Sequence, residues 1–171
     1  TWATRLRWLL LSLVPSALLL GVTLFIATDI ASAPFLWVVP LALYLLTFIV
    51  AFARRPILPH RWMLRLQLPV VGLAVVFYSI PGLYPTLVLH LAVLFVTAMV
   101  CHGELALSRP STRYLTEFYL WMSAGGLVGG LFNAVVAPLL FLSLAEYPLA
   151  MVVACMLVPP MTQDGDDFWS L

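Results

Sequence analysis

Charged residues are scarce in this chain of 171 residues, where they make up only 9% of the sequence. Hydrophobic residues make up 64%, and the mean hydropathy is +1.10. A chain of this composition lacks the polar residues needed to cover a water-soluble fold. The net charge is +1 and no basic stripe is present, so nucleic acid is excluded as a partner. The composition therefore indicates that the lipid bilayer is the solvent.

Motifs of soluble enzymes are also missing. The sequence has no Gly-rich loop after a strand, no Walker sequence, no nucleophile elbow and no zinc-ligand spacing. We therefore predict no catalytic residue and no metal site, and the sequence identifies no cofactor. The two cysteines, Cys101 and Cys155, fall in or beside apolar segments, where a thiol usually behaves as a small hydrophobe. A disulfide between them is the minor alternative.

Long apolar runs dominate what is present. A helix needs about 20 predominantly apolar residues to cross about 30 Å of hydrocarbon. Five segments meet this length readily, and a sixth, which contains Pro148, is marginal. The predicted spans are residues 8–28, 34–53, 63–80, 84–101, 115–136 and 146–159. We therefore predict an all-α fold, a polytopic membrane helical bundle of about six transmembrane helices, with one membrane domain over residues 1–161.

Prolines inside three of these spans predict a bundle of kinked, packed helices. Pro15, Pro40 and Pro69 each remove a backbone hydrogen bond that neighbouring groups must replace. Residues 162–171 are predicted to form a short acidic tail. Because Thr1 is not an initiator methionine and no secretory signal follows it, we expect a processed chain, a truncated chain or part of a longer polypeptide.

The arginines predict the orientation of the chain. Short loops rich in arginine remain in the cytoplasm. The eight basic residues precede the first span or fall in or at the edge of alternate linkers, namely Arg5, Arg7, Arg54, Arg55, Arg61, Arg65, Arg109 and Arg113. The intervening linkers contain none. This alternation predicts a multi-pass protein of the bacterial inner membrane, with an even number of spans and both termini in the cytoplasm.

Small residues in the fifth predicted span form the most specific local pattern. Gly125, Gly126, Gly129 and Gly130 make two overlapping Gly-x-x-x-Gly pairs. Small residues four apart form a groove on one helix face, in which a second backbone can approach closely. Tight helix packing is therefore the main interpretation, and a substrate passage that uses the same groove is the alternative.

Polar residues inside or at the ends of spans are candidates for a cavity or ligand site, because burying them in hydrocarbon is costly. These candidates are His90, Asn133 and Asp29. The simpler interpretation of His90 is a hydrogen-bonded role in packing, because no second histidine lies at the spacing of a pair that binds one ligand. A lone histidine in a span can also ligate a porphyrin or chlorin, and the neighbouring residues do not distinguish these roles.

A second polar group is expected at the cytoplasmic edge. Cys101, His102 and Glu104 cluster near the end of the fourth span, but residues one or two apart point in different directions on a helix. We therefore expect Glu104 to pair with Arg109 or Arg113 rather than to help bind a metal. Glu117 opens the fifth span, where a carboxylate favours the positive end of the helix dipole.

Several runs, in order over nearly the whole chain, carry a family resemblance. They include Cys101-His102-Gly103-Glu104 and Glu146-Tyr147-Pro148, and they cover residues 11–16, 20–23, 28–31, 36–48, 101–106, 115–134 and 146–149. The sequence resembles the membrane region of bacterial spermidine synthase-like proteins, in which a transporter-like multi-span region joins a cytoplasmic aminopropyltransferase-like domain. That soluble domain falls outside these residues, so the resemblance implies a membrane region and no substrate or reaction.

Three functions remain open on the sequence. The first is a non-catalytic integral membrane subunit or domain that packs against other membrane protein subunits in a larger assembly. The second is a half-transporter or permease-like unit for a small cationic solute, which would work with a second membrane half. The third is the membrane anchor of an aminopropyltransferase-like enzyme.

Overall fold

The computed structural model describes residues 1–27, 34–53, 58–77, 83–136, 139, 152–153 and 155–156, and every regular element in these ranges is helical. The longer helices are α1 (Trp2–Phe25), α2 (Val38–Ala51), α3 (His60–Phe77), α4 (Leu83–Leu107) and α5 (Leu115–Leu131). Short 3-10 helices, Pro34–Trp37 and Thr112–Tyr114, precede α2 and α5. A π-helical turn, Phe132–Val136, extends α5.

The prolines mark helix starts as well as interiors. Pro15 and Pro69 lie inside α1 and α3, as the sequence predicts. The prediction for Pro40 is wrong, because α2 begins only at Val38 and places Pro40 in its first turn. Backbone N–H groups in a first helical turn have no partner within the helix, so proline removes no helical hydrogen bond there.

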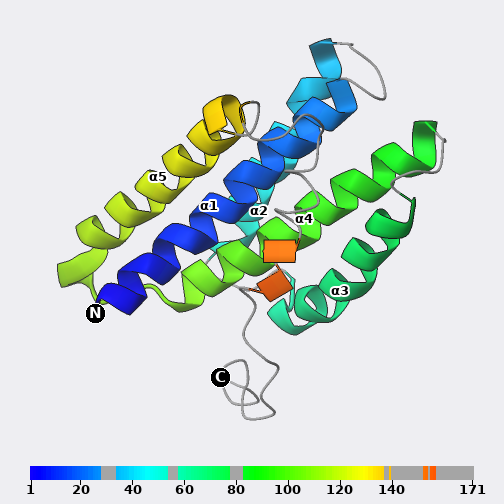
Figure 1. Cartoon of the computed structure of the whole chain (residues 1–171). Helices are drawn as coiled ribbons and strands as arrows, with labels where there is room; N and C mark the ends of the chain where they lie inside the picture. Colours follow the sequence, from blue (N-terminus) through cyan, green and yellow to red (C-terminus); the bar gives the residue numbers. More distant parts are fainter. Residues whose placement is uncertain are drawn as a thin grey trace.

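The helices alternate in direction along the chain. Arg7 of α1 pairs with Glu104 near the end of α4, while Phe25 contacts His90 nearer the start of α4, so α1 and α4 are antiparallel. The start of α5 lies beside the start of α1, and the two helices run parallel. Figure 1 shows α1 between α5 and α4, with α3 on the other side of α4 and α2 behind.

One end of the bundle collects the described arginines. His60, the first residue of α3, contacts Glu104, and the linker from α4 to α5 lies at the same end as the start of α1. We call this the arginine-rich end. Its described arginines are Arg5, Arg7, Arg61, Arg65, Arg109 and Arg113.

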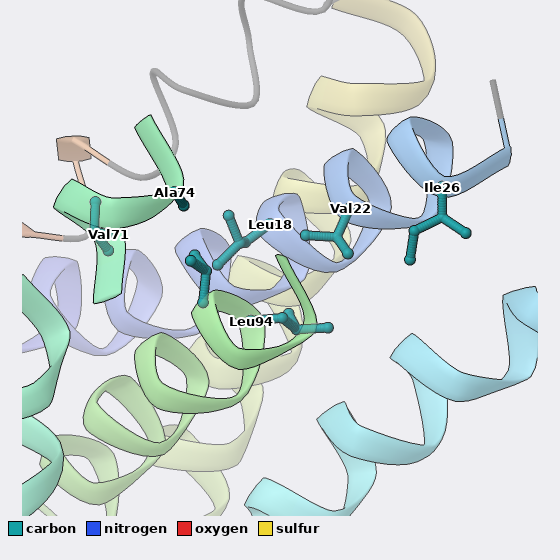
Figure 2. Close-up of a cluster of buried hydrophobic side chains, with 7 residues drawn as sticks. Leu18, Val22, Ile26, Val71, Ala74 and Leu94 are labelled. Carbon is teal, nitrogen blue, oxygen red and sulfur yellow. The ribbon is translucent and has the colours of Figure 1, made fainter. Parts of the chain in front are cut away.

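Three clusters of buried apolar side chains hold the helices together. The largest joins α1, α3 and α4, and Figure 2 shows its members Leu18 and Val22 of α1, Ile26 directly after α1, Val71 and Ala74 of α3 and Leu94 of α4. A second cluster joins Trp8, Leu11 and Val14 of α1 to Cys101, Leu105 and Phe118. The third packs Met63 of α3 against Met99 and Val100 of α4. Helix α4 contributes to all three clusters and is the central helix of the bundle.

The outer surface is apolar as well. Phe35, Leu68 and Leu120 are 87%, 70% and 67% exposed, and large aliphatic side chains cover the outward faces of α2, α3 and α5. Exposed apolar area on this scale is rare on water-soluble monomers and marks a surface that lipid or other helices cover. The apolar residues that dominate the composition thus form both the core and much of the outer surface.

Three helical stretches are long and apolar enough to cross a membrane, namely Trp2–Phe25, Thr86–Leu107 and Thr112–Val136. The prediction of an all-helical bundle containing such helices is confirmed at this level. Phe35–Ala51 is apolar but shorter. Helix α3 begins at His60, earlier than the predicted span, and so includes Arg61 in addition to Arg65, which the predicted span already contains.

The sixth predicted span and the acidic tail fall mostly outside the described residues. Of the span, residues 152–153 and 155–156 are described, and Cys155 packs against the cluster shown in Figure 2 while Val153 packs against the cluster around Trp8. Cys101 and Cys155 are both free thiols. The disulfide alternative is therefore not realised.

Candidate functional site

A buried carboxylate at the arginine-rich end joins three helices. Arg7 Nη2 donates to Glu104 Oε2 at 2.6 Å, and His60 Nε2 lies 2.8 Å from Glu104 Oε1. Glu104 is only 8% exposed, so it exchanges most of its hydration for these two partners. Because α1, α3 and α4 each supply one member, the Glu104 cluster, defined as Arg7, His60 and Glu104, fixes their positions relative to one another.

A glycine makes room for this cluster. A Cβ placed on Gly103 would overlap the ring of His60, with Cε1 only 2.8 Å away. The glycine next to Glu104 thus lets the start of α3 approach the backbone of α4. Beside the cluster, Trp8 Nε1 donates to Ser108 Oγ at 3.1 Å, which adds a second polar link between α1 and the end of α4.

The partners of Glu104 differ from those expected from the sequence. Arg109 and Arg113, which are near in sequence, are not its ion-pair partners in the described structure, and Arg7 and His60 take that place. The reason is geometric. Antiparallel packing brings the first turns of α1 to the last turns of α4, while Arg109 and Arg113 follow the end of α4 and lead away toward α5.

The three expected neighbours on α4 turn in different directions. Cys101 lies in the apolar cluster with Leu11 and Val14 of α1, whereas His102 stacks on Phe48 of α2 with ring centroids 3.6 Å apart. Glu104 faces Arg7 and His60. Among the described residues, no three His, Cys, Asp or Glu side chains converge on a point where a metal ion would bind.

His102 occupies a buried site between α2 and α4. Its Nδ1 lies 3.0 Å from Thr47 Oγ1, and the Thr47 hydroxyl donates to the Tyr44 carbonyl at 2.6 Å. Because that bond uses the hydroxyl hydrogen, Thr47 accepts from His102, which places the ring proton on Nδ1. Nε2 then carries the lone pair, and it has no hydrogen-bond partner among the described residues.

Glu117 lies in the first turn of α5, as expected, and forms an ion pair with Arg5 of α1. Both side chains of this pair are about one third exposed, at 35% and 31%. Solvent screens such a pair, so we expect it to contribute less to stability than the contacts of the buried Glu104 carboxylate. Together the two carboxylates link α1 to α4 and to α5 at the arginine-rich end.

The two glycine pairs of α5 have different surroundings. A Cβ on Gly125 would overlap Ser12 and the Leu9 carbonyl, and one on Gly129 would overlap the Leu13 carbonyl. A Cβ on Gly126 would meet no described atom within 4 Å, and one on Gly130 would only reach a Leu20 methyl at 4.0 Å. Gly125 and Gly129 therefore form the close backbone contact with α1.

Asn133 belongs to the same contact between α1 and α5. Its Nδ2 donates to the Ala17 carbonyl at 3.0 Å, and Ser16 Oγ donates to the Gly126 carbonyl at 2.9 Å. These bonds use the Asn133 amide to join two helices. His90 lies elsewhere, fully buried on α4 with its ring 4.4 Å from the ring of Phe25, and Asp29 is outside the described residues.

Four polar residues of the bundle were not predicted from the sequence as members of a site. Arg7 and His60 become partners of Glu104 only through tertiary packing, which no local pattern reveals. Gln67 and Thr97 are buried at 2% and 0% exposure, with Gln67 Nε2 and Thr97 Oγ1 unpartnered among the described residues. A signal for them was present, because Gln67 interrupts an apolar segment and Thr97 stands midway between His90 and Glu104.

Comparison with known proteins adds no relative, since no family model, no curated protein and no solved structure matches this chain.

Proposed function

We propose that this chain is a non-catalytic, multi-pass membrane domain or subunit of the bacterial inner membrane that packs in a larger assembly. The proposal includes six spans and a cytoplasmic arginine-rich end. Three helices of suitable length and the gathering of six described arginines at one end support this arrangement. An aminopropyltransferase-like domain of the kind implied by the family resemblance is one partner that would lie on that side.

The outward face of α5 is the observation that carries the proposal. In the most apolar 18-residue window of Thr112–Val136, which contains α5, only 11% is buried. The corresponding share is 56% both for Trp2–Phe25 in α1 and for Thr86–Leu107 in α4. This peripheral helix nevertheless carries a second pair of glycines, Gly126 and Gly130, that α1 does not fill. Small residues on a lipid-facing helix allow a further helix to approach closely. We therefore assign this face to a partner helix.

The polar groups in the described bundle support a structural role. Glu104 is held by Arg7 and His60, and Asn133 is bonded to the backbone of α1. The half-transporter hypothesis would need His90 and Asn133 to face one cavity. Instead they contact α1 at Phe25 and Ala17, eight residues and about 12 Å apart along that helix. We therefore favour the subunit over the half-transporter.

The experiment is to isolate the tagged protein from its native membrane in mild detergent and to measure the polypeptide mass of each particle. We expect a mass well above the 18.9 kDa of one chain. Gly126→Ile should release the partner while the chain stays folded, because no described atom of this chain lies within 4 Å of the added Cβ.

Val76→Phe is the matched control, since Val76 is 66% exposed on α3 and the change adds bulk on a different outward face. The control should remain assembled. A wild-type particle that holds a single chain would refute the proposal. A Gly126→Ile particle of unchanged mass would show that the partner does not bind at the outward face of α5.

A further inference from the structure

The first turns of α3 place two arginines on the outward face of the bundle. Arg61 and Arg65 are both exposed, and because they are four residues apart they are neighbours on one side of the helix. The opposite side of α3 is buried at Met63 and Gln67. Figure 1 shows α3 at the edge of the bundle, beside α4. The arginine pair therefore faces the surroundings of the bundle rather than its core.

The same face of α3 continues as an apolar surface. Leu68 and Val75 are 70% and 51% exposed, and a Cβ on Gly72 would meet no described atom within 4 Å. Positions 61, 65, 68, 72 and 75 follow one another at intervals of three or four residues, which keeps them on one side of an α-helix. We call these five residues the α3 stripe. Its charged end lies at the arginine-rich end of the bundle, and its apolar part leads away from it.

Trp62 marks the level of the lipid headgroups beside this stripe. It directly follows Arg61 and is 60% exposed, and exposed tryptophans concentrate at the membrane interface. Arg65 stands three residues further along α3, which is about 4.5 Å deeper. Side chains on a helix lean toward its N-terminus, so the Arg65 guanidinium reaches back toward the level of Trp62 and Arg61. Two guanidinium groups thus gather at the headgroup level.

The charge of Arg65 is not balanced within the described chain. The two described carboxylates, Glu104 and Glu117, are taken by the partners named above, and Arg65 forms no ion pair with a described residue. A cation at the edge of the hydrocarbon is costly unless it reaches a headgroup or water. Phosphate complements arginine, whose guanidinium donates to two oxygens at once. A zwitterionic headgroup carries a cation of its own beside the phosphate, so an anionic headgroup fits the pair better.

We propose that the α3 stripe binds an anionic phospholipid, with the phosphate between Arg61 and Arg65 and one acyl chain along the apolar part of the stripe. The arginines select the charge of the headgroup, and the apolar positions hold the chain. The site rests on the membrane insertion of α3 that is part of the proposed function. It adds a ligand to that function and does not depend on the partner helix at α5.

The test measures which lipid the protein retains. The protein, isolated with its partners, is reconstituted into bilayers of equal parts phosphatidylglycerol and phosphatidylcholine with the same acyl chains, and is then extracted again in mild detergent. Native mass spectrometry counts the lipids bound per copy of this chain. We expect phosphatidylglycerol to be retained in preference, and Arg65→Gln should lower its retention by about fivefold. Arg65→Lys keeps the charge and should retain more phosphatidylglycerol than Arg65→Gln.

Arg113→Gln is the matched control. It removes the same charge at the same end of the bundle but outside the α3 stripe, where the Arg113 guanidinium lies 5.7 Å from the centre of the Tyr114 ring. Retention of phosphatidylglycerol should not change in this variant. Circular dichroism checks that Arg65→Gln stays folded, as expected of a change that breaks no ion pair among the described residues.

Two results would overturn the lipid site. One is a wild-type protein that retains both lipids equally, and the other is an equal loss of phosphatidylglycerol in Arg65→Gln and Arg113→Gln, which would indicate general attraction by the charged end. The polypeptide mass that tests the subunit role is measured separately from the lipid count, so failure of either proposal can be recognised on its own.

Discussion

At the scale of single residues, Glu104 shares its two carboxylate oxygens between helices on either side of α4. One oxygen accepts from Arg7 and the other lies beside His60. Hydrogen bonds that involve charged groups contribute more than neutral ones, and an enclosed carboxylate is costly when it loses its partners. Glu104 therefore holds the arginine-rich end together more strongly than a surface ion pair would.

Substitution of Glu104 tests this role. Glu104→Gln keeps the side-chain shape but leaves Arg7 and His60 without the charge, and we expect the free energy of unfolding to fall by about 1–3 kcal/mol. Denaturant unfolding in detergent, followed by circular dichroism, measures the change. Glu117→Gln is the control, because the exposed pair with Arg5 should contribute less than about 1 kcal/mol. Equal losses in the two variants would contradict the special role of Glu104.

The tautomer of His102 provides a second test at this scale. Nitrogen-15 NMR of labelled protein should show the ring proton on Nδ1, where the Thr47 oxygen accepts it. Thr47→Val removes that acceptor and should lower stability by about 1 kcal/mol while perturbing the Nδ1 resonance. His102→Gln removes its own ring signals and so identifies which of the histidine signals belong to His102. A proton found on Nε2 in the wild-type protein would show that the Thr47 contact is described wrongly.

Residue-level partners were the hardest feature to predict from the sequence. The divergence of Cys101, His102 and Glu104 follows from helix geometry and was expected. The choice of Arg7 and His60 over Arg109 and Arg113 depends on which helices pack together, and no local pattern contains that information. Gln67 and Thr97 were missed because neither is ionisable, and a single neutral polar side chain in an apolar run is a weak signal of a site.

At the scale of helices, the contact between α1 and α5 depends on two glycines. Gly125 and Gly129 lie against the backbone of α1, and Ser16 and Asn133 add hydrogen bonds across the same contact. Such interhelical hydrogen bonds contribute about 0.6 kcal/mol on average in membrane proteins. Close backbone packing at Gly125 and Gly129 adds to these bonds.

Alanine substitutions separate the two glycine pairs. Gly129→Ala places a methyl group against the Leu13 carbonyl, which cannot move aside as a side chain does, and should cost about 1–3 kcal/mol of unfolding free energy. Gly126→Ala meets no described atom within 4 Å and should be neutral or stabilising by up to about 1 kcal/mol, because alanine favours the helix. Thermal unfolding in detergent measures both. A loss in Gly126→Ala as large as in Gly129→Ala would contradict this assignment.

The sequence predicted a small-residue groove on this helix but not which pair fills it. The spacing of Gly125, Gly126, Gly129 and Gly130 is the same for both pairs, and the rotation of α5 about its axis decides between them. That rotation is set by the ion pair of Glu117 with Arg5 and the bond from Asn133 to Ala17, which are tertiary contacts. The start of α2 was missed for a related reason, since Pro40 fits a first turn as well as an interior kink.

At the scale of the whole molecule, the arginines fall in every second linker along the sequence, and this agrees with helices that alternate in direction. The described arginines all lie at one end of the bundle, although they come from the start of α1, the start of α3 and the linker before α5. The general fold was predictable because long apolar runs form helices in lipid, where backbone groups must be paired within the segment. The number of spans is less predictable, since α2 is short and α3 carries two arginines in its first turns.

Sidedness of the arginine-rich end tests the central claim of a multi-pass membrane domain most directly. In a chain whose Cys101 and Cys155 are replaced by alanine, Arg113→Cys, Gly82→Cys and Asp166→Cys provide single thiols at the arginine-rich end, in the linker between α3 and α4 and in the acidic tail. Each is labelled in intact cells with a membrane-impermeant maleimide. We predict that Gly82→Cys reacts from outside, while Arg113→Cys and Asp166→Cys react only after the membrane is opened. Labelling of Gly82→Cys and Arg113→Cys from the same side would contradict the account.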